Sequence, residues 1–259
     1  MNPSPARTLA ASALALCALL TTAACSALTT PPTAPKPDLT ATTSRPATTP
    51  APAGAAALTQ AQAQAALIRV TDLGEPWTPA QSAATWHDGL LKARTNLPDC
   101  RRLLDSLYAE ELFGTDPRAR AVIGLDDTWN EAQLRYQVVT QPRAEVDRTL
   151  AWLKTLPRKC EEFTATNVRG TEQGVEVTEA PLPEVGDARQ ALRVTVYGET
   201  PDGEPVVLTV DVAAVRVGDD AIVLTHGGFG DVAHDITEGA VHLGAERLTT
   251  VRKQGRAEI

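Results

Sequence analysis

Four cysteines are the residues of this chain with the richest covalent chemistry: Cys17, Cys25, Cys100 and Cys160. A thiol can carry a lipid through a thioether, pair in a disulfide or bind a metal. If the chain is exported, Cys100 and Cys160 are expected to form one disulfide, with two buried free thiols or a reactive pair as the alternatives. Two cysteines alone do not make a structural zinc site, which takes four ligands.

The segment before Cys25 has the pattern of a bacterial lipoprotein leader. Arg7 is its only charged side chain, an apolar run covers residues 9–20, and Thr-Ala-Ala occupies residues 22–24. Such a run is too short to cross a hydrocarbon core of about 30 Å as a helix, and it fits a removable signal. The segment resembles a lipobox with Thr22 where leucine is usual, which implies a diacylglycerol on Cys25 and a stable anchor. The alternative is an ordinary secretory signal, cleaved after small residues.

Metal and cofactor binding are not expected from the four histidines, His87, His226, His234 and His242. His234 and His242 lie eight residues apart on an expected helix, about 80° around its axis, so they do not form the i, i+4 pair of a zincin. His226 and Asp231 could approach the start of that helix. If His226, Asp231 and His234 converged within coordination distance, the expectation that the protein is not an enzyme would be much weaker.

Serine and paired-carboxylate catalysis are not expected either. Ser82 and Ser106 are the only serines after residue 57, and neither lies in a G-x-S-x-G elbow. The adjacent acids Asp126-Asp127 and Asp219-Asp220 should point apart, whereas glycosidase acids face each other across about 5 to 9.5 Å. Solvated turns account for both pairs, so we assign no catalytic residue.

Two further features leave a binding site open. Gly227-Gly228-Phe229-Gly230 precedes the last expected helix, where free N–H groups of residues 227–231 could hold an anion. A tight connection with positive φ is the simpler interpretation. Trp77 and Trp86 could line a groove or pack against a helix layer, and we favour packing. Trp152 is expected in the core.

Composition divides the chain into three parts: a leader (1–24), lipidated Cys25 with a linker (25–57), and a domain (58–259). The linker has seven prolines and eight threonines after Cys25, with no aromatic residue, and is expected to act as an extended spacer. The net charge of −8 becomes −9 when Arg7 leaves with the leader. An acidic domain argues against nucleic acid as a partner. It also disfavours extended contact with anionic lipid head groups, so the membrane contact should be the anchor alone.

Periodicity predicts an α+β domain with an antiparallel sheet flanked by helices. Helices are expected from Thr59, capped together with Gln62, to residues 74–76; from Pro98, with Asp99 as cap; from Pro142 to Leu156, ended by Pro157; and after Asp231 as cap. Strands are expected over 119–125, 133–140, 174–179, 190–197, 205–217 and 221–225, followed by a glycine-rich bend over 227–230.

Several local patterns together resemble the extracellular sensor domain of some mycobacterial receptor serine/threonine kinases, which also occurs in free actinobacterial lipoproteins. They are Pro98-Asp99-Cys100, Tyr136-Gln137-Val138-Val139, Trp152 eight residues before Cys160, and Asp219-Asp220-Ala221-Ile222-Val223. The resemblance implies a helix-flanked antiparallel sheet with a cleft for an unidentified envelope ligand. It also implies two disulfides, of which this chain can form one. No kinase region accompanies the domain in this sequence.

We therefore expect a lipid-anchored protein on the extracytoplasmic face of the cell membrane. Its domain should bind an unknown ligand or partner protein as a sensor or accessory factor, without catalysis. An envelope hydrolase with an unrecognised carboxylate or histidine site is the alternative, and a structural or chaperone-like lipoprotein is another.

Overall fold

The computed structural model describes residues 57–257. The expected leader, Cys25 and nearly all of the expected linker lie outside the described residues, as do residues 258–259. The strands are β1 (Trp77–Pro79), β2 (Ala93–Arg94), β3 (Ala119–Asp127), β4 (Ala132–Thr140), β5 (Glu162–Asn167), β6 (Glu172–Glu179), β7 (Ala188–Glu199), β8 (Pro205–Val217) and β9 (Asp220–Phe229). The helices are α1 (Gln60–Ala65), α2 (Val70–Leu73), the π-helix η1 (His87–Leu91), α3 (Pro98–Tyr108), α4 (Arg143–Leu153), α5 (Leu156–Lys159) and α6 (His234–Ala257).

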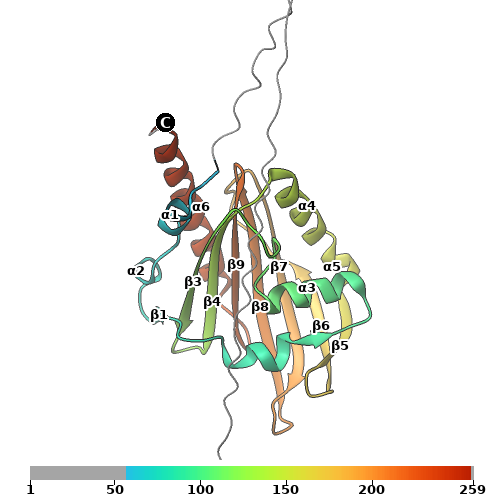
Figure 1. Cartoon of the computed structure of the whole chain (residues 1–259). Coiled ribbons are helices and arrows are strands. Elements are labelled where there is room, and N and C mark those ends of the chain that lie inside the picture. The colour runs from blue at the N-terminus through green and yellow to red at the C-terminus, as the bar shows by residue number, and fades with distance from the viewer. Residues whose placement is uncertain (1–56, 258–259) are drawn as a thin grey trace, which may run out of the picture. The chain divides into compact units, whose positions relative to one another are not determined.

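The strands of the described part form one nine-stranded sheet in the order β1-β3-β4-β9-β8-β7-β6-β5-β2 (Figure 1). Every neighbouring pair is antiparallel. The strands expected over 190–225 lie side by side in it, because β7 pairs with β8 and β8 with β9. The predicted α+β class with a helix-flanked antiparallel sheet is confirmed.

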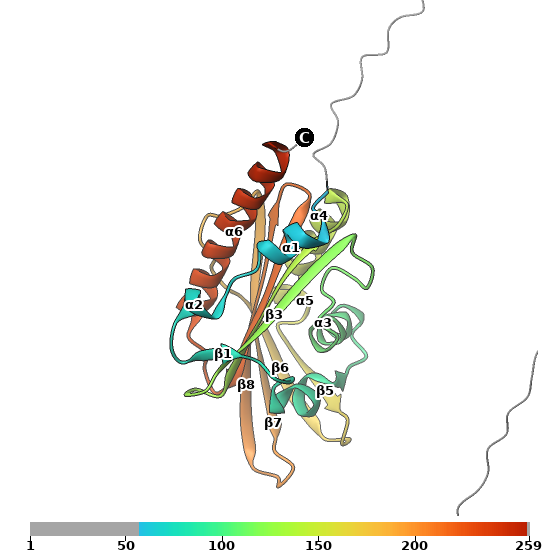
Figure 2. The ribbon, with the colours of Figure 1, turned by 60° about the vertical axis from the view of Figure 1, so that its left-hand side comes forward.

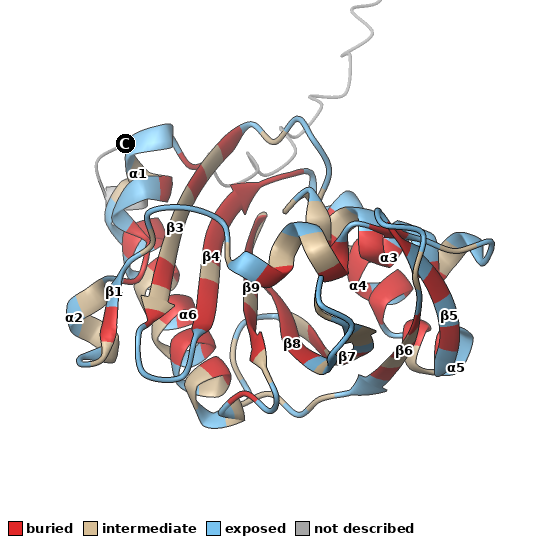
Figure 3. Ribbon diagram, turned by 90° about the horizontal axis from the view of Figure 1, so that it is seen from below, coloured by how far each residue is buried: buried red, intermediate tan, exposed pale blue. Residues whose placement is uncertain are grey.

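Helices cover both faces of the sheet. Figure 2 shows α1 and α6 on one side, and α3 and α4 on the other. Along β8, Ala213 and Val215 belong to the core beneath α6, whereas Val212 and Ala214 belong to the core beneath α3 and α4. Because both faces are covered, β8 is buried from Leu208 onward, and the buried colour runs along the central strands in Figure 3. Its valine-rich run reflects this two-sided burial.

The first expected helix is present but is divided into α1 and α2. Thr59 and Gln62 form the predicted capping box. The chain then leaves the helix where the Arg247 guanidinium, from α6, binds the Leu67 carbonyl at 2.6 Å and the Asp72 carboxylate at 2.7 Å. These bonds come from a residue far along the chain, so local pattern does not predict the break.

Two other helix boundaries differ from the expected ones. The cap position of α3 is Leu97, and Asp99 caps nothing, because its carboxylate accepts hydrogen bonds from Trp152 and Lys159 instead. The next helix ends with α4, before the expected stop. Pro157 does not terminate it but lies in the first turn of α5, where a missing N–H has no helical partner to lose.

The strands also differ from the expected ones. The short strands β1 and β2 and the longer β5 have no counterpart among the expected strands. In β5, Phe163, Ala165 and Asn167 are buried in alternation with exposed residues. The signal is weak because these residues are mostly small or polar. β9 continues through residues 226–229, where a bend was expected, and Gly227 pairs there with both β4 and β8. No helix within residues 57–257 has the length and apolar character that a membrane span requires.

Candidate functional site

Two of the four histidines, His226 of β9 and His234 at the start of α6, lie close to Asp211 of β8. Nδ1 of His234 lies 2.6 Å from Asp211 Oδ2. Thr237, one turn further along α6, donates to the same oxygen at 3.1 Å, and its hydroxyl lies 3.2 Å from Nδ1 of His226. Arg193 of β7 donates to both carboxylate oxygens, at 2.8 and 3.3 Å. These five residues are called the Asp211 network below.

The His234 ring lies between two oxygen atoms. Its Nδ1 faces the Asp211 carboxylate, and its Nε2 lies 3.1 Å from the carbonyl oxygen of Pro181. These two contacts fix the orientation of the ring. Asp211 therefore contacts both the Arg193 guanidinium and the His234 imidazole.

The Asp211 network is closed to solvent at its centre. Asp211, Thr237 and His226 are no more than 2% exposed. Burial raises the pKa of Asp211, but hydrogen bonds from Arg193 and His234 outweigh it and hold the pKa below its usual value. Burial lowers the pKa of His226 to about 4, so this ring is neutral at neutral pH. Thr237 and His226 are too deeply buried to meet a substrate, and we interpret the network as structural.

Asp231 does not join the two histidines. It pairs with Arg193 at 3.1 Å and is otherwise exposed, and because α6 begins at His234 it is not the cap of that helix. His242 is exposed on α6, and His87 lies in η1. Among residues 57–257, no group of three or more His, Cys, Asp or Glu side chains is placed to hold a metal ion.

Two of the acids expected in solvated turns are buried. Asp220 has no exposed surface; it accepts a 2.6 Å hydrogen bond from Thr140 and pairs with Arg252. Asp127 is 7% exposed and accepts the backbone N–H groups of residues 129 and 130, which closes the turn between β3 and β4. The prediction that these two acids are solvated was therefore wrong. The partner of Asp220 is on α6, which is distant in sequence, so local patterns do not reveal the pairing.

Neither serine is placed beside a base. Ser82 lies exposed between β1 and η1, and Ser106 is half-buried on α3. Within residues 57–257 neither side chain has a hydrogen-bond partner. An activated serine would need a base within about 3 Å.

The glycines near residue 227 provide space for packing. A Cβ on Gly227 would lie 2.9 Å from a ring carbon of Trp86, so only glycine fits under this buried indole. Gly230, in the connection to α6, has the expected positive φ of 75°. Trp77 is buried edge-on against His226, with ring centroids 5.6 Å apart. Both tryptophans therefore pack in the core, as favoured, and the 227–229 segment is strand.

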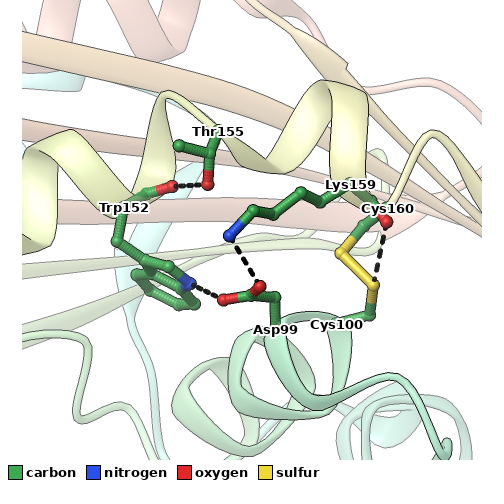
Figure 4. Close-up of a disulfide and its surroundings, with 6 residues drawn as sticks. All are labelled: Asp99, Cys100, Trp152, Thr155, Lys159 and Cys160. Atoms are coloured by element: carbon green, nitrogen blue, oxygen red, sulfur yellow. Dashed lines mark hydrogen bonds and ion pairs between the residues drawn. A yellow bond between two sulfur atoms is a disulfide. The ribbon is translucent and has the colours of Figure 1, made fainter.

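A covalent and polar clamp joins α3 to α5, and we call it the α3 clamp. Cys100 and Cys160 form a disulfide with Cα atoms 5.6 Å apart, one of the states that the cysteine count allowed. Figure 4 shows Trp152 and Lys159 converging on Asp99 beside it, with donor distances of 3.0 and 2.8 Å. Hydrogen bonds from Lys159 and Trp152 lower the pKa of Asp99. The clamp fixes the start of α3.

A cavity of about 510 Å³ lies at the edge of the sheet beside α3. Residues 91–94 form one part of its lining, Asp105 and Tyr108 of α3 a second, and residues 166–168 at the end of β5 a third. Its volume is within the range of small-molecule sites. We call it the α3 cavity.

Two cations in the lining of the α3 cavity form no ion pair within the described part of the chain. Nζ of Lys92 lies 5.1 Å from the centre of the Tyr108 ring, and a hydrogen bond with the Tyr108 hydroxyl raises the pKa of Lys92. His87 stacks on Tyr108 at 4.8 Å between ring centroids and steadies it. The guanidinium of Arg94 is exposed and has no acidic partner among residues 57–257.

The lining also includes a buried amide with an unused donor. Asn167 is 5% exposed, and its Oδ1 accepts the N–H groups of Arg169 at 3.0 Å and Thr171 at 3.1 Å. Those bonds define which end of the amide is oxygen. Its Nδ2 has no partner among the described residues. An unpaired buried donor costs about 1–3 kcal/mol, so this group can gain from a bound acceptor.

None of these lining residues was among the predicted site residues. Lys92 and Arg94 follow η1 in a stretch without clear periodicity, and Asn167 ends a strand that the sequence did not indicate. The pair Asn167 and Gly170 signals a turn, but no local pattern shows that this turn meets α3.

No family model matches the chain, and no curated protein matches it in sequence. Its structure is similar to the extracellular domain of PknH from Mycobacterium tuberculosis, with 15% identity and a TM-score of 0.47 over 77% of this chain and 100% of that one. It is also similar to protein Ms6760 from Mycobacterium smegmatis, with 12% identity and a TM-score of 0.26 over 53% of this chain and 93% of that one. The first is an extracellular domain of the kind that the sequence resembles, and the likeness concerns the fold alone.

Proposed function

We propose that this chain is a lipid-anchored protein of the cell envelope whose extracytoplasmic domain binds a small ligand in the α3 cavity. The lipid is carried by Cys25, and the Pro/Thr-rich linker holds the domain away from the membrane. The protein acts as a sensor or an accessory factor, through binding rather than catalysis.

The unpaired polar lining of the α3 cavity is the observation that carries this proposal. Three other arginines of the sheet and of α6 are paired with acids: Arg193 with Asp211, Arg216 with Asp147 and Asp187, and Arg247 with Asp72. Lys92 and Arg94 instead line, without ion pairs, a cavity large enough for a small molecule, and the Asn167 amide in the same lining has an unpaired nitrogen. Polar groups without partners beside a cavity are what a ligand would satisfy.

The Cys100–Cys160 bond supports a location outside the cytoplasm, because structural disulfides persist mainly in oxidising compartments. It also restrains α3, which supplies Asp105 and Tyr108 to the cavity. Because α3 is restrained by the disulfide, it loses less conformational entropy when a ligand binds.

The anchor is tested by replacing Cys25 with serine in the full chain. We expect Cys25→Ser protein to move from the membrane fraction to the medium, measured by immunoblotting of both fractions. Cys17→Ser is the matched control, because it removes a thiol from the expected leader without touching the lipidation position, and it should stay with the membrane. Membrane retention of the Cys25→Ser protein would contradict the anchor.

Ligand binding is tested by thermal unfolding of the full chain in detergent micelles, with and without the low-mass fraction of envelope extract from the source organism. Val168→Trp places an indole in the cavity from an exposed position, and Val207→Trp makes the same change on β8 outside the lining. We expect the extract to raise the Tm of wild type and Val207→Trp, and to leave Val168→Trp unchanged. Equal shifts in all three proteins, or none, would contradict binding in the cavity.

A further inference from the structure

The α3 cavity presents positive charge on an acidic protein. The chain has a formal net charge of −8, yet the lining contains two cations, Lys92 and Arg94, and one acid, Asp105. Asp105 also lines a neighbouring cavity together with Arg101 and Arg102. The guanidinium of Arg94 matches a carboxylate or a phosphate, which it can bind through two parallel hydrogen bonds.

Asn167 adds a neutral donor with the same preference. Its Oδ1 is occupied by two backbone N–H groups, so only Nδ2 remains, and an amide N–H can bond only to an acceptor. This atom has almost no exposed surface, so a ligand reaches it only when the side chains around it shift. We expect it to act as an inner donor, bonded to the ligand directly or through one water.

Apart from the exposed Thr166, the rest of the lining is apolar or aromatic. Leu91 and Ala93 are buried, Val168 is 57% exposed, and the Tyr108 ring contacts both the His87 ring and the Lys92 ammonium. Such walls would hold a hydrophobic or aromatic body next to the charged groups.

From this juxtaposition of Lys92, Arg94 and the Asn167 amide we infer that the α3 cavity binds a small molecule carrying a carboxylate or phosphate on an apolar body. The inference rests on the proposed function, because it specifies the ligand class of the same cavity. Lys92 and Arg94 contribute charge, Asn167 contributes the inner donor, and Tyr108 contributes contact with the ligand body.

Three probes of similar size distinguish a carboxylate, a phosphate and a neutral ligand. Isothermal titration calorimetry of the full chain in detergent micelles would measure the Kd of benzoate, phenyl phosphate and benzyl alcohol. We expect both anions to bind and the neutral alcohol to bind much more weakly. The ratio of the two anion affinities then shows whether the natural group is a carboxylate or a phosphate.

Two variants remove the groups that should hold the anion. Arg94→Gln should weaken anion binding by about tenfold or more, the value of one hydrogen bond to a charged group. Arg118→Gln is its control, because Arg118 is exposed and lies outside the lining. Asn167→Asp keeps an oxygen for the two N–H groups of the turn but replaces the donor with a negative charge. It should weaken anion binding at least as much, whereas Gln254→Glu, which adds the same charge at an exposed position of α6, should not.

A third variant should strengthen binding. Asp105 is exposed and makes no side-chain hydrogen bond within residues 57–257, so Asp105→Asn should leave the fold intact. Removal of the one acid from the lining should tighten anion binding severalfold, and the gain should shrink at high salt. A gain cannot come from partial unfolding, so this variant separates electrostatics from damage to the fold.

Several results would overturn the inference. They are benzyl alcohol binding as tightly as the anions, anion binding that Arg94→Gln and Asn167→Asp leave unchanged, and no anion binding at all. If the envelope extract still protects wild type but not Val168→Trp, the cavity remains a ligand site and only its anionic chemistry is wrong. If the extract also fails to distinguish these proteins, the proposed function fails with it.

Discussion

The Asp211 network and the α3 cavity contain similar residue types but differ in how their polar groups are paired. The network combines an acid, an arginine, two histidines and a threonine beneath α6, and each carboxylate oxygen of Asp211 has at least one donor. The cavity beside α3 combines a lysine, an arginine and an asparagine, and neither cation forms an ion pair within residues 57–257.

This difference separates polar residues that stabilise the fold from polar residues that can bind a ligand. The network contains residue types that can act as acids or bases. They are buried and already hydrogen-bonded to one another, so they are not available to a substrate. In the lining of the cavity, Arg94 and Nδ2 of Asn167 have no partner among the described residues, and Lys92 contacts Tyr108 without forming an ion pair. Their hydrogen-bond partners must then be water molecules or a ligand.

The largest effect is expected from Asp211→Asn. Loss of this charge leaves the partly buried Arg193 guanidinium without its buried counter-ion, so the free energy of unfolding should fall by about 3–5 kcal/mol. Urea denaturation followed by circular dichroism measures it. Asp105→Asn is the matched change in the cavity and should alter stability by less than about 0.5 kcal/mol. Similar losses for the two variants would remove the distinction between the regions.

A somewhat smaller loss is expected when the α3 clamp is opened. Cys100→Ser with Cys160→Ser removes a cross-link that spans 60 residues, and the chain-entropy account gives about 4 kcal/mol or less. Guanidinium denaturation at pH 7 measures the change. The loss should be accompanied by weaker binding of phenyl phosphate, because α3 forms one wall of the cavity. Unchanged affinity would show that the clamp stabilises the fold without shaping the cavity.

The Asp211 network should also make stability depend on pH through His226. The folded pKa is about 4 and the unfolded value about 6.5, so between these pH values only the unfolded chain binds the proton. Stability from this group is complete above pH 6.5 and falls as the pH drops towards 4, by about 3 kcal/mol in total.

His226→Gln keeps a polar contact for Thr237 and should flatten this part of the profile, measured by urea unfolding between pH 7 and 4. The contribution of Asp211 follows a different course, since its lowered pKa gives stability that is lost only in more acidic solution. A His226→Gln profile parallel to wild type would contradict the assignment.

The smallest effect on stability is expected from Arg94→Gln. Arg94 is exposed and has no ion pair in the described residues, so stability should change by less than about 0.5 kcal/mol. Arg193→Gln, the matched change in the network, should cost several times more because Arg193 donates to both oxygens of Asp211. Equal losses in thermal unfolding would show that Arg94 has a structural role after all.

Much of the fold could be predicted from local patterns, but little of the site. The alternation of Leu192, Val194 and Val196 with polar residues indicated β7, and the capping box at Thr59 indicated the start of α1. β5 was missed, and with it Asn167. Asn167 matters because it lines the α3 cavity together with α3 and residues 91–94. Residues next to it in the sequence do not indicate that placement.

Sequence alone determined the fold class, the antiparallel hairpins from 190 to 225 and the availability of two domain cysteines, because these follow from side-chain periodicity, turn chemistry and residue counts. The tertiary structure alone decided that His226 and His234 are locked around Asp211 while Lys92, Arg94 and Asn167 face a cavity. Pairing and burial depend on which distant strands and helices meet. Those two quantities decide whether a polar side chain supports the fold or remains available to a ligand.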